Sequence, residues 1–387
     1  MNDFIYQNTT KIYFGKDQMK HLGTEVKKHG SKVLITYGGG SVQRSGLLDK
    51  TKKELEAVGL KYVEFGGIEP NPRVESVNKA IELCRKEKVD VLLPIGGGST
   101  IDATKAIAAG FYYDGDAWDL WNGTSKITNA LPIVTILTLS ATGTEMNAGG
   151  VISKMDTHEK YGMSHPSMLP KASFLNPENT YTVSKFQTAA GAADMMSHML
   201  EQYFTLEHMD MMDEITEGIM RTVIQHAPIA MEEPENYESR ANLMWASTWA
   251  LNSLINRGKT TGWSCHDMEH ELSAFYDITH GLGLAILTPK WMNYVLSEEN
   301  VHRFKRFAMK VFNVEECDDD FKVAKAGIQK LADFFEIELQ LPGTLTAINI
   351  DDTHFKEMAE KAVFGDTIDG LMTLHASDVE AIYKMCL

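Results

Sequence analysis

The strongest constraint on the fold is an alternation of β-branched runs and helical stretches through the first 180 residues. Residues 32–36 read as a strand that leads through glycines into a helical stretch at 47–58. Further strands are expected at 61–65, 89–95 and 133–139, with helices at 74–86 and 100–109. Such βαβ alternation predicts a mostly parallel sheet with helices on both faces.

The pattern changes after Pro177, where β-branched runs give way to long segments with helical spacing. Ser184 is a suitable N-cap for the first of these helices. The expected helices cover residues 189–203, 211–226, 241–254 and 321–335. We therefore expect an α/β domain over residues 1–180 and an all-helical domain over residues 181–387.

Charge and cysteine usage exclude several classes of protein. Lys plus Arg number 37 and Asp plus Glu number 53, a net charge of −16 that disfavours nucleic acid or an anionic membrane as the partner. No apolar run approaches the ~18 residues of a membrane span, and no secretory signal is visible at the amino terminus. The four cysteines form no CxxC pair. A soluble cytoplasmic protein is expected.

A glycine-rich loop, Gly96-Gly97-Gly98-Ser99, separates an expected strand from an expected helix. Glycines let a ligand approach the backbone closely, and the free amides at a helix start favour a phosphate. Ile101 breaks the strict GxGxxG fingerprint, and no Walker motif is present. An ordinary turn is the alternative, but three consecutive glycines exceed what a turn needs.

A second loop follows the first strand and has the sequence Gly38-Gly39-Gly40-Ser41. NAD-binding strands usually end near an acidic residue that binds the adenine ribose. Here glycines, a hydroxyl and the nearby Arg44 stand instead, which leaves room and positive charge for a 2′-phosphate. This pattern favours NADP(H), although a flexible loop would have the same composition.

A third segment, residues 138–145, is rich in hydroxyl groups directly after a buried strand. It either lines the phosphate and nicotinamide of a cofactor or forms a simple hydroxyl-rich turn. The sequence leaves both readings open.

Candidate metal ligands gather in the second half. Asp194 and His198 stand at i, i+4, and His266 and His270 repeat that spacing, with His280 ten residues further on. Oxygen and imidazole ligands suit Zn²⁺ or Fe²⁺. Five ligands would leave no open position for substrate, so at least one is expected to serve as a supporting group or proton carrier. Spacing alone does not choose which.

A rival motif overlaps this set, because residues 266–270 match the H-x-x-E-H pattern of inverted zinc peptidases. In that reading His266 and His270 bind zinc and Glu269 is the general base. It leaves the glycine loops unexplained, so it ranks below an oxidoreductase.

Taken together, these motifs resemble the iron-containing (group III) alcohol dehydrogenases, most closely the branch of NADPH-dependent butanol dehydrogenases and broad-specificity aldehyde reductases. The resemblance spans the chain, through Glu69-Pro70-Asn71-Pro72, the GGGSxxD run ending at Asp102, and the segments 138–145, 194–198 and 266–281. It implies a dehydroquinate-synthase-like fold whose α/β half binds the dinucleotide, and it suggests a homodimer.

The resemblance also implies roles for single residues. It implies that the metal is bound by Asp194, His198, His266 and His280, and that His270 is the catalytic histidine near the nicotinamide. The residues that it implies for cofactor binding are Gly38, Gly39, Gly40, Ser41, Gly97, Gly98, Ser99, Asp102, Thr138, Thr142 and Lys160. Iron and zinc both occur in the family, so the native metal stays open.

The expected reaction is hydride transfer between NADP(H) and a small primary alcohol or aldehyde, such as butanol and butyraldehyde. The hydroxyl-poor helical half, rich in Met and Trp, favours an apolar aldehyde over a polyol. The alternatives are an NAD-dependent glycerol or polyol dehydrogenase of the same fold, the zinc peptidase, and a non-catalytic nucleotide- or zinc-binding protein.

Overall fold

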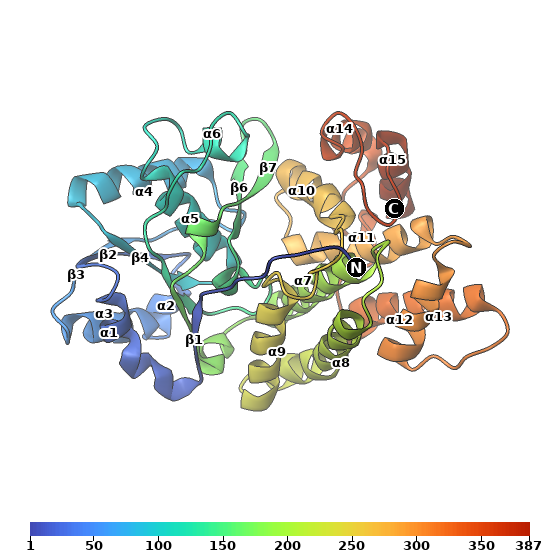
Figure 1. Cartoon of the computed structure of the whole chain (residues 1–387), viewed down its shortest axis with the longest axis horizontal. Coiled ribbons are helices and arrows are strands. Elements are labelled where there is room, and N and C mark those ends of the chain that lie inside the picture. Colours follow the sequence, from blue (N-terminus) through green and yellow to red (C-terminus); the bar gives the residue numbers. More distant parts are fainter. The chain divides into compact units, whose positions relative to one another are not determined.

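A computed structural model describes all 387 residues, and its first half contains a six-stranded parallel sheet (Figure 1). Every neighbouring pair in the sheet is parallel, as the βαβ alternation predicts. In spatial order the strands are β1 (Lys11–Phe14), β8 (Ala172–Leu175), β5 (Val134–Leu137), β4 (Val91–Gly96), β2 (Lys32–Tyr37) and β3 (Lys61–Phe65).

Both faces of this sheet are covered, because successive side chains of a strand point to opposite sides. Leu34 and Leu92 pack against α4 (Val74–Glu87) and α5 (Gly98–Gly110). Val33 and Ile35 pack on the other side against α1 (Leu22–Val26) and α3 (Leu47–Glu56). In Figure 1, α4 and α5 lie above these strands and α1 and α3 below them. The inner strands β2, β4, β5 and β8 are accordingly buried along almost their whole length.

Several short elements complete the α/β part. An antiparallel hairpin of β6 (Gly149–Lys154) and β7 (Glu159–Ser164) was not expected from the sequence. Its strands carry glycines and charged residues instead of a β-branched run. Two four-residue helices also occur here, α2 (Ser41–Arg44) and α6 (Trp118–Trp121).

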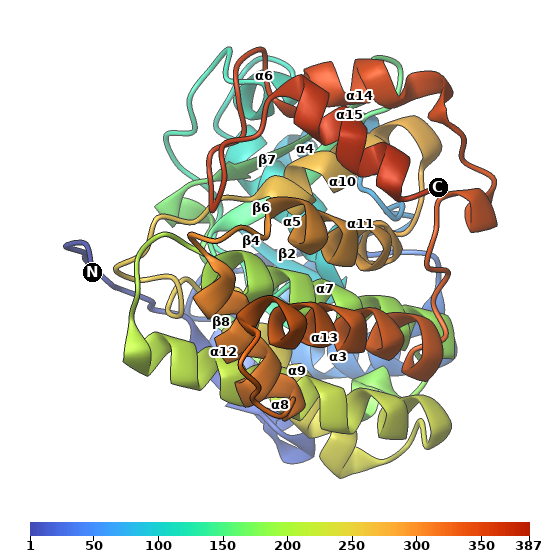
Figure 2. The same cartoon turned by 90° about the vertical axis from the view of Figure 1, so that its right-hand side faces the viewer.

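The second half is helical, as predicted. Helix α7 is its core, since every residue from Thr188 to Tyr203 is buried. Two pairs of helices, α12 with α13 and α14 with α15, lie side by side (Figure 2). The helices of this half are α7 (Lys185–Tyr203), α8 (Asp210–Glu232), α9 (Tyr237–Ala250), α10 (Ser264–Tyr276), α11 (His280–Val295), α12 (Val301–Phe312), α13 (Asp320–Asp333), α14 (Phe355–Ala362) and α15 (Ala376–Met385).

By their contacts the residues divide into two compact units. One comprises residues 7–183 and 234–252, and the other comprises residues 1–6, 184–233 and 253–387. The main division lies close to the expected boundary at 180/181. Helix α9 differs from the expectation, because it belongs to the α/β unit.

Two contacts explain the placement of α9. The Thr248 hydroxyl donates a hydrogen bond to the buried Glu145 carboxylate, and Asn147 Nδ2 donates to the Leu251 carbonyl at 3.1 Å. Helical periodicity does not reveal which partner a helix packs against, so the sequence did not distinguish α9 from its neighbours.

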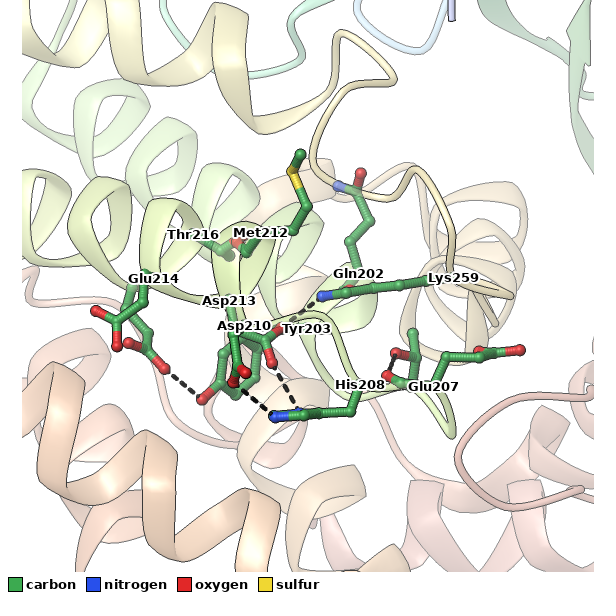
Figure 3. Close-up of polar contacts among 12 residues, drawn as sticks. Gln202, Tyr203, Glu207, His208, Asp210, Met212, Asp213, Glu214, Thr216 and Lys259 are labelled. Atoms are coloured by element: carbon green, nitrogen blue, oxygen red, sulfur yellow. Dashed lines mark hydrogen bonds and ion pairs between the residues drawn. The ribbon is translucent and has the colours of Figure 1, made fainter. Parts of the chain in front are cut away.

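A buried group of charges ties the helical unit together (Figure 3). The Asp213 carboxylate on α8 accepts hydrogen bonds from Lys259 Nζ at 2.6 Å and from Arg303 at 2.6 Å. His208 Nδ1 lies 3.2 Å from the same carboxylate. Pairing of this kind is what allows full burial of Asp213 and Lys259.

Among the helices, none combines the length and apolar character needed to cross a membrane.

Candidate functional site

Helix α7 presents two predicted ligands and an unpredicted carboxylate on one face. Asp194, His198 and Glu201 stand at i, i+4 and i+7, a spacing that repeats along one side of a helix. The helix begins at the predicted N-cap, Ser184, whose hydroxyl accepts a hydrogen bond from the Gln187 amide at 3.2 Å. All three functional side chains are buried.

Two further imidazoles converge on Asp194. Its Oδ1 atom lies 3.5 Å from His198 Nδ1, 3.9 Å from His266 Nε2 and 3.7 Å from His280 Nε2. His266 stands in the first turn of α10, and His280 is the first residue of α11. The four residues that the resemblance implies as metal ligands therefore meet around one point. The ligand atoms of Asp194, His198 and His266 all lie within 4.8 Å of one another.

Two buried carboxylates hold the far side of these imidazoles. Glu201 on α7 is hydrogen-bonded to Nδ1 of His266, and Glu269 on α10 is hydrogen-bonded to Nδ1 of His280. Both glutamate side chains are fully buried. A carboxylate that accepts the Nδ1 proton leaves the lone pair on Nε2, the atom that faces Asp194. Sequence reasoning missed Glu201, although its i+7 spacing from Asp194 was a usable signal.

This donor set fits a divalent cation. His198 Nδ1 and His266 Nε2 are buried and have no hydrogen-bond partner. Burial, then the neighbouring His266 and His280, hold the pKa of His198 well below its usual range, so the imidazole is neutral. Burial opposes protonation of His266, but the charge and hydrogen bond of Glu201 outweigh it and raise its pKa. One carboxylate oxygen and imidazole nitrogens suit Zn²⁺ or Fe²⁺, and a bound cation would displace any proton from His266 Nε2.

His270 stands apart from the converging atoms. It is half-buried, and its ring centroid lies 5.7 Å from that of His280. The compact group of possible ligand atoms comprises Asp194, His198 and His266, and His280 joins it through its Nε2 atom, 3.7 Å from Asp194 Oδ1. A half-buried imidazole beside the site suits a proton carrier better than a ligand.

Glycines allow α11 to approach the other two helices. A Cβ atom at Gly281 would overlap the Ala190 carbonyl oxygen of α7, and one at Gly283 would lie 2.7 Å from Glu269 Cγ of α10. Only glycine permits such close backbone contact. The two glycines thus place His280 beside Asp194 and seat Glu269 against α11.

In the α/β unit the predicted glycine loop connects β4 to α5. Strand β4 ends at Gly96 and α5 begins at Gly98, so the amides of this loop lie at a helix amino terminus, where they favour an anion. A Cβ atom at Gly98 would lie 2.6 Å from the Thr142 side chain. The Thr138 amide donates to the Gly96 carbonyl at 3.0 Å. The structure therefore brings Thr138 and Thr142 to the glycine loop.

Asp102 lies in α5, the helix that follows the glycine loop, and binds two later segments of the chain. Its carboxylate accepts hydrogen bonds from Thr144 Oγ1 at 2.6 Å and from the Val151 amide at 3.0 Å. Burial raises the pKa of Asp102, and the charges of Lys105 and of the buried Lys160 on β7 only partly oppose that rise. The implied role of Asp102 as a support of the glycine loop stays a prediction.

Lys105 is a residue that sequence reasoning missed. Its fully buried ammonium donates to Thr144 Oγ1 at 2.7 Å, to the Asn147 carbonyl at 2.9 Å and to the Gly149 carbonyl at 2.6 Å. Burial lowers the pKa of Lys105 to about 8, against the opposing effect of Asp102 and Glu145. It stands three residues after Asp102 and ties the segment 144–149 to α5.

The first glycine loop leads from β2 into the short helix α2. Gly40 has a φ of 95°, a left-handed conformation that favours glycine. Arg44 is exposed, and a Cβ atom at Gly40 would lie 3.3 Å from its guanidinium. No acidic side chain pairs with Arg44, so its charge is available near the end of β2.

Comparison with known proteins identifies the family. The model of the family described as iron-containing alcohol dehydrogenase matches residues 9–177, and that of its C-terminal region matches residues 188–387. The chain belongs to the iron-containing alcohol dehydrogenase family. It is 49% identical over 387 residues to NADH-dependent butanol dehydrogenase A of Clostridium acetobutylicum, covering 99% of each chain.

Two more members of the family are instructive. NADPH-dependent aldehyde reductase YqhD of Escherichia coli is 40% identical over 367 residues, which are 93% of each chain. The crystal structure of NADH-dependent butanol dehydrogenase A from Thermotoga maritima superimposes with a TM-score of 0.96 at 39% identity, covering 100% of this chain and 99% of that one. The predicted family, its butanol dehydrogenase and aldehyde reductase branch, and the α/β-plus-helical fold are confirmed.

Membership of this alcohol dehydrogenase family argues against the zinc-peptidase reading, and so does the site. Glu269, the general base of that reading, is hydrogen-bonded to His280 Nδ1 and accepts a second hydrogen bond from Ser273 Oγ at 2.5 Å. Both oxygens are thus engaged in supporting contacts. The H-x-x-E-H motif therefore does not have the arrangement of a peptidase site here, because its glutamate supports His280.

Proposed function

We propose that this alcohol dehydrogenase is a metal- and NADP(H)-dependent enzyme that interconverts small primary alcohols and aldehydes such as butanol and butyraldehyde. The observation that carries the proposal is the convergence of three imidazoles on Asp194, with Glu201 and Glu269 bound to the far side of two of them. NADPH is held reduced in cells, so aldehyde reduction is the proposed direction.

Asp194, His198, His266 and His280 would hold the metal, which is Fe²⁺ or Zn²⁺ by the chemistry of the donor set. When bound, such an ion acts as a Lewis acid toward the alcohol or carbonyl oxygen, and the nicotinamide supplies or accepts the hydride. The side chains of the protein bind and orient these groups and exclude water. The carboxylates orient the ligands, and the buried surroundings of α7 exclude water.

His270 is proposed to carry the proton between substrate and solvent. It lies beside His280, and its partial exposure keeps it within reach of water. Imidazole changes its protonation near neutral pH, which suits this transfer.

The dinucleotide is proposed to bind the α/β unit through the amides of Gly97, Gly98 and Ser99 at the start of α5. Asp102 supports this loop, and Thr138, Thr142 and Lys160 contribute further cofactor contacts. The hydrogen bond from Thr144 to Asp102 and the approach of Thr142 to Gly98 support this arrangement.

The NADP(H) preference rests on Gly38, Gly39, Gly40 and Ser41, with the uncommitted Arg44 beside them. The named relatives divide on this point, since the butanol dehydrogenases are called NADH-dependent and YqhD is called NADPH-dependent. A 2′-phosphate is the group that Arg44 would recognise, so Arg44→Ala should weaken NADPH use more than NADH use.

Polyols are the second substrate class. The family also includes 1,3-propanediol dehydrogenase of Citrobacter freundii, which is 28% identical over 368 residues. The greater identity to butanol dehydrogenases favours an apolar substrate. A homodimer and a cytoplasmic location remain predictions.

The test follows absorbance at 340 nm with butyraldehyde and NADPH, then NADH, on protein loaded with Fe²⁺ or Zn²⁺ and on chelated protein. Metal-dependent oxidation that is faster with NADPH is expected. Faster oxidation of NADH would overturn the cofactor preference alone. Oxidation by neither cofactor, repeated with polyols and their aldehydes, would overturn the proposed function.

A further inference from the structure

We propose that Glu201 and Glu269 are positioning residues that set metal affinity, and that they do so unequally: Glu201 requires both carboxylate oxygens, whereas Glu269 does not. This inference rests on the proposed metal centre. It concerns how two imidazoles are held in the form that can bind an ion.

The two contacts of Glu201 both come from hydrogen-bond donors. Its Oε1 atom accepts the backbone amide of Cys265 at 2.6 Å, and its Oε2 atom is bonded to His266 Nδ1. A backbone amide has a fixed proton and can only donate. A group at position 201 must therefore offer two acceptors in order to keep the proton of His266 on Nδ1.

Glu269 has one adaptable neighbour. Its Oε2 atom is bonded to His280 Nδ1, but its Oε1 atom accepts from the hydroxyl of Ser273 at 2.5 Å. A hydroxyl both donates and accepts. Ser273 also has an alternative acceptor, the carbonyl of Ile278 at 3.4 Å, to which its proton can turn.

Replacement by the amide of the same shape separates the two cases. In Glu201→Gln the amide –NH₂ group must face either the Cys265 amide or His266 Nδ1. The first choice opposes two donors in a buried place, and the second moves the proton of His266 to Nε2, where it blocks the metal. In Glu269→Gln the –NH₂ group donates to Ser273 Oγ, and the remaining oxygen still accepts from His280 Nδ1.

The pattern also connects the three helices that carry the ligands. Glu201 of α7 holds a ligand on α10, and Glu269 of α10 holds a ligand on α11. Each imidazole is therefore oriented by the preceding helix of the series. Carboxylates in such positions typically change metal affinity by 10–100-fold when removed.

Glu217 provides a matched control. It is fully buried in the same helical unit, on α8, and binds the Tyr203 hydroxyl at 2.8 Å and Arg306 Nε at 2.6 Å. It contacts none of the converging ligands. Glu217→Gln therefore repeats the loss of a buried carboxylate charge without touching an imidazole.

The experiment measures Zn²⁺ affinity of the full chain by competition with a chromophoric chelator, with folding checked by circular dichroism. Glu201→Gln should lose at least ~10-fold in affinity, Glu269→Gln less than ~3-fold, and Glu217→Gln less than ~2-fold. Equal losses at 201 and 269, or wild-type affinity in Glu201→Gln, would overturn the inference. A wild-type chain that binds no Zn²⁺ or Fe²⁺ would instead overturn the proposed function.

If Glu201→Gln does not fold, a double variant tests the other half of the inference, the role of the Ser273 hydroxyl. Ser273→Ala removes the hydroxyl that rescues the amide, so Glu269→Gln combined with Ser273→Ala should bind Zn²⁺ at least ~5-fold more weakly than the product of the single effects. Simple additivity of the two changes would contradict the adaptable-hydroxyl explanation.

Discussion

The backbone of Gly281 lies directly against the carbonyl group of Ala190, so helix α11 begins in contact with helix α7. Ala190 stands one turn before Asp194, and Gly281 follows His280. This contact sets the distance between the ligand that α11 contributes and the carboxylate on which it converges.

Replacing Gly281 with alanine should therefore disturb the metal centre as well as the packing. The added Cβ atom overlaps backbone, which cannot turn aside as a flexible side chain can, so α11 must move away from α7. We expect a stability loss of about 1–3 kcal/mol in urea unfolding and weaker Zn²⁺ binding in chelator competition.

Gly218→Ala is the control for this substitution. Gly218 lies within α8, and its added Cβ atom would be 3.7 Å from the nearest neighbour outside the helix backbone, a side-chain atom of Arg221. Alanine should stabilise that helix by up to about 1 kcal/mol and leave Zn²⁺ affinity unchanged. Unchanged Zn²⁺ affinity in Gly281→Ala would show that α11 is not positioned by this contact.

His270→Ala should separate proton transfer from metal binding. Because His270 is proposed as the proton carrier and not as a ligand, the variant should keep its metal, while kcat falls about 10²-fold or more. His266→Ala, in the same helix, should lose both metal and turnover. Metal content measured by elemental analysis checks both; loss of metal from His270→Ala would make His270 a ligand.

Lys105→Met should loosen the attachment of the segment 144–149 to α5. The substitution leaves buried carbonyl and hydroxyl oxygens without a donor and removes the cation near Asp102 and Glu145. Breaking such a buried arrangement typically costs about 3–5 kcal/mol. We expect a lower melting temperature and a larger increase in KM for the dinucleotide than decrease in kcat; an unchanged KM would contradict a link between Lys105 and the loop.

Glu25 should contribute a stability that is lost in acid. Burial alone would raise the pKa of Glu25, but hydrogen bonds from Lys28 and Tyr13 and the charge of Lys11 lower it to about 2. Its ordinary value is near 4.5, so between pH 4.5 and 2 the unfolded chain binds a proton that the folded chain does not. The stabilisation is therefore complete above pH 4.5 and declines as the pH falls toward 2.

The measurement compares urea midpoints of the wild type and Glu25→Gln at pH 7 and at several values below pH 4.5. The difference between them should be largest at pH 7 and shrink in acid. A difference that stays constant with pH would contradict the lowered pKa.

Much of the fold follows from local sequence patterns. Apolar β-branched runs identified strands β2, β4 and β5, because strands buried on both faces need apolar residues at nearly every position. Helical spacing and the Ser184 cap identified α7 to within four residues of its start. The β6–β7 hairpin escaped detection because its strands contain glycines and charged residues and lack a regular apolar alternation.

The candidate site was predictable in its residue types but not in its arrangement. Two i, i+4 pairs and His280 marked five possible ligands, yet which imidazoles converge on Asp194 depends on how α10 and α11 pack against α7. The choice came from the family resemblance, and the geometry agrees with it. Glu201 and Lys105 were missed because their partners, His266 and the 144–149 segment, are distant in sequence.

The most direct test of the central claim is a metal titration of the metal-free wild-type chain. Fe²⁺ or Zn²⁺ is added in known amounts, and bound metal and butyraldehyde-dependent oxidation of the dinucleotide are measured in the same samples. Because the four proposed ligands converge on one point, activity should rise in proportion to bound metal and stop at one ion per chain. Full activity in the metal-free chain would contradict the assignment of Asp194 and its three histidines as a catalytic metal centre.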